Sequence, residues 1–203
     1  MPNIKTYLST LALVIASSVA LTGQASAQSE TQEEEAPVDR GFNLGEEADT
    51  TPQPGDTYVK EEFGAWSLRC IVVPEGDDPC QMYQMLLEPG GSPLAEYTMF
   101  RLPEGGQAAA GATIVVPLET SLQAELSIQV DDGATKRYPF AFCNTVGCYA
   151  RIGLTPEDIN AYKAGGAATI TIVPIAAQDQ TVAVELSLEG FTAAFGAASV
   201  LQQ

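Results

Sequence analysis

Residues 122–130 read Leu-Gln-Ala-Glu-Leu-Ser-Ile-Gln-Val, so apolar and polar side chains alternate along the whole stretch. A period of two is typical of a β-strand that turns one face to a core and the other to solvent. Asp131-Asp132-Gly133 follows as a hairpin turn signal, and Tyr138, Phe140 and Phe142 alternate beyond it. The pattern predicts a half-buried strand over 122–130 and a return strand through 138–142.

Other short runs extend this prediction to an all-β fold. Residues 182–188 alternate in the same way, residues 169–173 are rich in β-branched side chains, and further strands are predicted at 66–73, 81–87, 94–101 and 112–116. One short helix is predicted after Thr155, which can cap it, with Pro156 and two acidic residues in its first turn and Gly165-Gly166 at its end. Short strands joined by turn-rich connections predict an antiparallel β-sandwich with one short helix.

The first 57 residues differ in composition from the rest of the chain. Residues 1–27 hold Lys5, an apolar run over 8–16 and the small-residue sequence Ala25-Ser26-Ala27, which together predict a secretory signal peptide. Residues 28–57 are rich in Glu, Asp and Pro and predict an acidic disordered tail, either a spacer or an arm that docks on a basic partner. Residues 58–203 form the predicted β-sandwich domain.

The predicted signal peptide indicates where the mature chain is expected to be located. Beyond the leader, no stretch approaches the roughly 20 apolar residues of a membrane-spanning helix, so no transmembrane segment is expected after signal cleavage. The expected location is the periplasm, with outer-membrane association and secretion as alternatives.

The charge and the missing histidines exclude several classes of function. Nine Lys and Arg stand against 26 Asp and Glu, a net charge of −17, which disfavours nucleic acid as a partner. The chain has no His, the commonest general base and metal ligand. The Gly-rich segments form no nucleotide-binding motif. We therefore predict no catalytic residue, no metal site and no cofactor, and we expect a protein partner.

Four cysteines form two close pairs, and an exported chain meets an oxidising compartment. The favoured disulfides are Cys70–Cys80, across the turn-rich residues 74–79, and Cys143–Cys148, across a tight loop in which Gly147 is free to take positive φ. A crossed pairing between the halves and a four-thiolate zinc site are the alternatives.

Four segments then carry a family resemblance. They are Phe-Gly-Ala-Trp-Ser-Leu-Arg-Cys at 63–70, Cys-Gln-Met-Tyr-Gln at 80–84, the stretch from Asp-Asp-Gly at 131–133 to Cys-Tyr-Ala at 148–150, and Ser-Leu-Glu-Gly-Phe-Thr-Ala-Ala at 187–194. In this order and spacing they resemble the invasion-associated locus B family of bacterial envelope proteins. The resemblance implies an exported, immunoglobulin-like β-sandwich, linked in some relatives to host-cell invasion, and it brings no catalytic residues.

These observations lead to a predicted function and two rivals. The predicted function is a non-enzymatic, exported protein-binding module whose two disulfide loops border the binding surface. One rival is a periplasmic assembly or envelope-maintenance factor that uses an exposed sheet edge. The other, less favoured, is a carboxylate-based hydrolase.

The aromatic residues Trp66, Tyr83, Tyr97 and Tyr149 are predicted to lie in the core. Residues 190–201 are predicted either to close the domain or to present an apolar patch.

Overall fold

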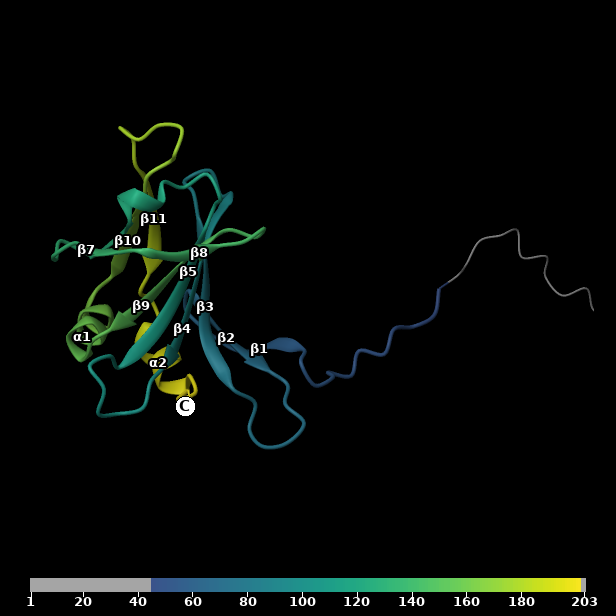
Figure 1. Ribbon diagram of the computed structural model, residues 1–203. Coiled ribbons are helices and arrows are strands. Elements are labelled where there is room, and N and C mark those ends of the chain that lie inside the picture. The colour runs from purple at the N-terminus through teal and green to yellow at the C-terminus, as the bar shows by residue number, and fades with distance from the viewer. Residues whose placement is uncertain (1–44, 202–203) are drawn as a thin grey trace, which may run out of the picture. The chain divides into compact units, whose positions relative to one another are not determined.

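The computed structural model describes residues 45–201 (Figure 1), so the predicted signal peptide and most of the predicted acidic tail lie outside the described residues. Residues 45–56 contain no helix or strand. The strands are β1 Thr57–Phe63, β2 Trp66–Ile71, β3 Cys80–Leu87, β4 Pro93–Arg101, β5 Ala110–Val116, β6 Leu126–Val130, β7 Lys136–Tyr138, β8 Phe140–Cys143, β9 Cys148–Leu154, β10 Ala167–Ile172 and β11 Val182–Ser187. The helices are α1 Pro156–Ala164 and α2 Phe191–Ala197.

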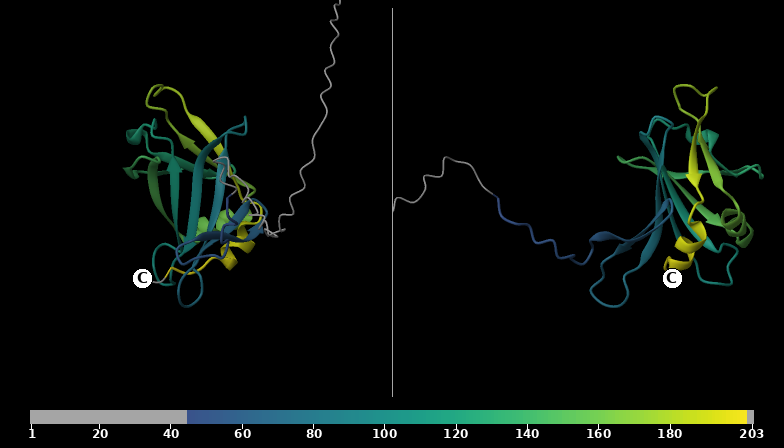
Figure 2. Two further views of the ribbon diagram at one scale, coloured as in Figure 1. Left: turned by 90° about the vertical axis from the view of Figure 1, so that its right-hand side faces the viewer. Right: turned by 180° about the vertical axis from the view of Figure 1, so that it is seen from behind.

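Two antiparallel sheets make up the fold (Figures 1 and 2). The larger has the order β1-β2-β3-β4-β5-β9-β8, and the smaller has the order β11-β10-β6-β7. Alternate residues of both sheets point inward and are buried, as in β9, where Cys148, Ala150, Ile152 and Leu154 are covered. The predicted all-β sandwich is therefore confirmed, and α2 is a second helix beside the predicted one.

An aromatic cluster joins both helices to the larger sheet. Trp66 is 1% exposed and meets Tyr97 and Phe191 edge-on, at ring-centroid distances of 5.8 and 5.6 Å. Phe191, from α2, also meets Tyr162 of α1. The predicted place of Trp66 in the core is confirmed, since aromatic rings of this size supply much of the apolar area that a small domain buries.

The strand predicted over 122–130 is wrong in its first half. Residues Leu122–Ala124 form a 3₁₀ turn, Glu125 has a φ of 61°, and the strand begins at Leu126. Leu122 is 46% exposed rather than buried. This segment carries the chain from β5 in the larger sheet to β6 in the smaller one, and the Ser121 N–H donates to the Val173 carbonyl on the way. Because the chain must change sheets here, the tertiary arrangement overrides the local alternation.

The predicted return strand is also divided between the sheets. The turn forms as expected, with the Gly133 N–H donating to the Val130 carbonyl and Ile128 opposite Lys136. However, β7 ends at Tyr138, and β8 begins at Phe140 in the larger sheet, where it pairs with β9. Pro139 separates them, and proline suits such a break because it has no N–H for a ladder.

The predicted helix is confirmed in its start and its end. The Asp158 N–H donates to the Thr155 hydroxyl, and the Asp158 carboxylate accepts from the Thr155 N–H, so the two residues form a capping box. Pro156 occupies the first turn and Gly165 follows the last residue.

Segments far apart in the sequence are tied together beside α2. Gly190 has a φ of 80°, and a Cβ added there would lie 2.0 Å from the Phe63 carbonyl oxygen. The Ala65 N–H donates to the Glu189 carbonyl. The Gln84 amide, on β3, bonds both the N–H and the C=O of Ser187 at 2.8 and 3.0 Å. These contacts fix the β1–β2 turn and the β11–α2 connection to one another.

Candidate binding surface

Antiparallel pairing gathers the connections of the sandwich at two ends. The loop end holds the β3–β4 turn (88–92), the β5–β6 connection (117–125), the β8–β9 turn (144–147) and the β10–β11 loop (173–181). The Ile175 N–H donates to the Glu119 carbonyl there, which ties two of these loops together. The helix end holds both helices, residues 72–79 and the segment 199–201 (Figure 1).

Exposed apolar side chains concentrate at the loop end. Ten large apolar residues of the described part of the chain are well exposed, and seven lie here: Met85, Leu87, Leu118, Leu122, Phe142, Val146 and Ile175. The most exposed are Val146 at 71% and Ile175 at 57%. Single exposed apolar residues are ordinary on a protein surface, but a group of them marks a site of interaction.

The β8–β9 turn is built to present Val146. The Cys143–Cys148 disulfide joins directly paired residues whose Cα atoms are 4.0 Å apart. Inside the loop, the Asn144 carboxamide oxygen accepts from the Val146 N–H at 2.8 Å. Gly147 does not have a positive φ, so the reason expected from the sequence for a glycine at this position is wrong. It is glycine because a Cβ would lie 2.5 Å from the Val116 carbonyl oxygen, which lets the turn pack against β5.

A shallow hollow of about 370 Å³ lies between this turn and the outer face of the larger sheet. We call it the apolar hollow; it is lined by Met85, Pro93, Leu94, Ala95, Glu96, Val115, Val116, Pro117, Leu118 and Val146. Glu96 is the one carboxylate in this lining, whereas glycosidase chemistry needs two that face each other. The lining of the apolar hollow therefore does not supply the facing pair of carboxylates that this chemistry needs.

Aromatic side chains flank the β8–β9 hairpin on the sheet surface. The rings of Phe142 and Tyr149 stack with centroids 4.6 Å apart, and the Arg151 guanidinium lies 5.3 Å from the Phe142 ring. The prediction that Tyr149 lies in the core is therefore wrong. Tyr83 is buried, but it lies on the outer face beneath Arg69, whose guanidinium carbon is 3.1 Å from the ring centroid.

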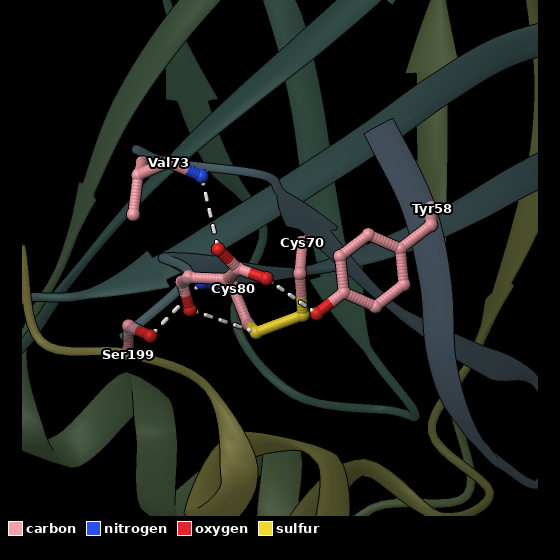
Figure 3. The surroundings of a disulfide bond; sticks show 6 residues. Tyr58, Cys70, Val73, Cys80 and Ser199 are labelled. Carbon is pink, nitrogen blue, oxygen red and sulfur yellow. Dashed lines mark hydrogen bonds between the residues drawn. A yellow bond between two sulfur atoms is a disulfide. The ribbon is translucent and has the colours of Figure 1, made fainter. Parts of the chain in front are cut away.

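The second disulfide, Cys70–Cys80, lies at the helix end, and Figure 3 shows its surroundings. Cys70 and Cys80 are direct partners on β2 and β3, and the Cys80 N–H donates to the Ser199 hydroxyl at 2.9 Å. Both disulfides are the pairs that the sequence favoured. The expectation that both loops border one surface is wrong for Cys70–Cys80, because β3 runs from this disulfide to the loop end.

Hydrogen bonds hold the Cys70–Cys80 loop in place. The Asp78 carboxylate accepts from the Val73 N–H at 2.9 Å and from the Tyr58 hydroxyl at 2.8 Å. These two donors, the Val73 amide foremost, lower the pKa of Asp78, and the bond to Asp78 raises the pKa of the Tyr58 hydroxyl. Polar contacts thus tie this loop to β1, whereas the hydrogen bonds of Asn144 lie within the β8–β9 turn itself.

The buried tyrosines and Asp158 make contacts within the fold. The Tyr97 and Tyr162 hydroxyls lie 3.4 Å apart in the core, and burial raises the pKa of both, so they stay neutral. Asp158 is engaged by Lys136 and by its capping box. Across residues 45–201, no group of three or more Cys, Asp or Glu side chains is placed to hold a metal ion. Neither helix of that range is long and apolar enough to cross a membrane.

Comparison with known proteins identifies the family of the chain. Residues 66–199 match the family described as "Invasion associated locus B (IalB) protein". The chain belongs to this family. Its fold is similar to the crystal structure of invasion associated protein B from Bartonella henselae, with 19% identity, a TM-score of 0.57, and coverage of 67% of this chain and 92% of that one. No curated protein matches the chain. The resemblance read from the four sequence segments is confirmed.

The four segments build the frame of the fold rather than the apolar hollow. They contain Trp66, Gln84, Gly190 and both disulfides, which pack the core and connect its parts. Most of the hollow lies outside them, and sequence reasoning missed it. One signal was available: Leu118 and Val146 are apolar residues inside predicted connections, where solvent-exposed positions are usually polar.

Proposed function

We propose that this chain is an exported, non-enzymatic protein of the bacterial envelope that binds a partner protein through the apolar hollow. The observation that carries the proposal is that three exposed, large apolar side chains, Met85, Leu118 and Val146, line one hollow of a very acidic chain, at the end where four more such side chains lie. A monomer gains nothing from exposing them together, whereas a partner that covers them removes apolar area from water.

Export is supported by three separate features. Residues 1–27 have the composition of a signal peptide, and both cysteine pairs are joined, which suits an oxidising compartment. The family and the similar Bartonella henselae protein are both named for invasion. A partner in the envelope, or one met at the cell surface, is consistent with all three.

The chemistry around the apolar hollow favours a protein as the partner. Glu96 lines it, Glu119 directly follows the lining residue Leu118, and an anionic membrane would repel these carboxylates. An apolar centre with a charged rim is the usual anatomy of a protein interface, and a stable one needs about 800 Å² from each side. The exposed residues of all four loops can contribute to such an area.

The test is a crosslinking pulldown from the cell envelope of the source bacterium, read by mass spectrometry. The bait is the mature protein, compared with a Leu118→Ser/Val146→Ser double variant and with Val59→Ser. Val59 is 50% exposed but lies on β1, away from the hollow, so it is the matched control. We expect a specific partner that Val59→Ser keeps and the double variant loses. Equal recovery by all three baits would overturn the proposal.

A second candidate function is an assembly factor that adds a client strand to β11. This strand is an edge of the smaller sheet, and the Gln84 amide already bonds the outward N–H and C=O of Ser187 as a neighbouring strand would. Alternation along an antiparallel strand points the same groups of Glu185 and Ala183 outward. Recovery of many unrelated exported proteins, unchanged in the double variant, would favour this candidate.

A further inference from the structure

A cavity at the helix end brings two cations to one aromatic ring. It measures about 310 Å³ and lies where the β4–β5 connection meets α1 and α2. The Arg101 guanidinium carbon is 5.6 Å from the centre of the Phe195 ring, and the Lys163 Nζ is 5.2 Å from it. Arg101 comes from the end of β4 and Lys163 from the last turn of α1, so the fold, not the local sequence, brings them together.

Neither cation has a carboxylate partner among the residues that the structure describes, although the chain is very acidic. The salt bridges within residues 45–201 are Lys136–Asp158 and Arg137–Glu125, both elsewhere. Glu104 lines the cavity but is not within 4.0 Å of either cation. Both cations lie against the same ring, and an anion that reached both of them would be attracted by two positive charges.

The remaining lining supplies polar donors and an apolar wall. Asn160 contributes a side-chain amide, and the turn at Gly105 and Gly106 contributes backbone. Gly105 has a φ of 97°, and the N–H groups of both glycines donate to no other group in the described part of the chain. Backbone N–H groups in such glycine turns are common ligands of phosphate oxygens.

We propose that this cavity, the phosphate pocket, binds the phosphate group of a phosphomonoester. A phosphate dianion neutralises both cations, whereas a carboxylate neutralises one. The planar guanidinium of Arg101 can bond two phosphate oxygens, and Lys163 adds a point charge. The cavity is small for a whole ligand, so it holds the phosphate and the atoms next to it, with Phe195 and Ile159 as the apolar wall.

Calorimetry of the mature protein with inorganic phosphate and with glycerol 3-phosphate tests this site. We expect binding that weakens about tenfold or more in Arg101→Gln and in Lys163→Gln, since each removes a charge-assisted hydrogen bond. Arg151→Gln is the matched control, because Arg151 also faces a ring, Phe142, without a second cation beside it. Arg101→Lys, which keeps the charge, should recover part of the affinity.

Two results would overturn the proposal: no phosphate binding, or equal loss in Arg151→Gln and Arg101→Gln. A sedimentation assay separates the sources of the phosphate, using phosphatidylcholine vesicles with and without phosphatidic acid. Capture by phosphatidic acid alone, lost in Arg101→Gln, assigns a lipid headgroup, whereas binding of the soluble esters alone assigns a soluble ligand. The Leu118→Ser/Val146→Ser variant should still bind phosphate, so this test stands apart from that of the apolar hollow.

Discussion

The two ends of this sandwich use a disulfide between paired strands for opposite purposes. At the helix end, Cys70–Cys80 lies within a polar network in which Asp78 and Ser199 bond neighbouring backbone. At the loop end, Cys143–Cys148 closes a turn whose tip, Val146, contacts solvent. The first disulfide connects parts of the protein, and the second holds an apolar side chain outward.

This difference separates the part of the molecule that specifies the fold from the part where the proposed partner would bind. Trp66, Phe191 and the close approach of Gly190 to the Phe63 carbonyl all lie toward the helix end, so a change there disturbs several elements at once. The loop end carries exposed side chains on separate loops, and surface substitutions of this kind usually change stability little. A binding surface can therefore vary at the loop end without loss of the frame.

The largest expected effect comes from a methyl group added at the helix end, and the same addition at the loop end is the comparison. Gly190→Ala places a Cβ 2.0 Å from the Phe63 carbonyl oxygen at a φ of 80°, and we expect it to lower the free energy of unfolding by about 3–5 kcal/mol. Gly91→Ala, in the β3–β4 turn, has a φ of 84° with open space around it, and should cost about 1 kcal/mol. Urea denaturation measures both.

The control is built into this pair, because the two glycines have nearly the same φ, 80° and 84°, which alanine disfavours equally at both positions. If the two alanine variants lose equal stability, crowding at the helix end has no weight, and the contrast between the ends is wrong.

Much of the fold could be predicted because apolar alternation and capping are local signals. Thr155 and Asp158 form the predicted capping box, and the strands at 81–87 and 94–101 lie within one residue of their predicted ends. The failures come where the chain changes sheets, at Glu125 and at Pro139, since no local pattern shows which sheet a strand joins. The strand β9 was missed although its alternation was readable in the sequence.

The candidate sites were less predictable than the fold for a physical reason. The apolar hollow draws on β3, β4, β5 and the β8–β9 turn, and the phosphate pocket on β4, α1 and α2. Arg101 and Lys163 are 62 positions apart, and only the packing of α1 against the sheet end brings them to Phe195. Sequence alone predicted the elements, but it did not supply the distances between their side chains.

Removing each disulfide should have the next largest effect. Cys70→Ala/Cys80→Ala opens a loop with a sequence separation of 10, and we expect a loss of about 3 kcal/mol in unfolding free energy. Cys143→Ala/Cys148→Ala opens one with a separation of 5 and should lose about 2 kcal/mol. Calorimetric melting of both double variants shows which of them loses more stability. A larger loss for the Cys143–Cys148 pair would show that its turn also stabilises the frame.

The smallest expected effect is on the pH dependence of stability. The Val73 N–H and the Tyr58 hydroxyl lower the pKa of Asp78 in the folded chain. Its ionised form therefore favours the folded state above the unfolded pKa of about 3.9, and this contribution is lost as the pH falls through the lower folded value. Stability of the wild type should thus decline between pH 5 and pH 2 more steeply than that of Asp78→Asn.

Asp77→Asn is the control, because Asp77 accepts no hydrogen bond from the described residues, and it should keep the wild-type slope. Parallel slopes for wild type and Asp78→Asn, measured by urea denaturation at each pH, would mean that these polar contacts do not tie the Cys70–Cys80 loop to the frame.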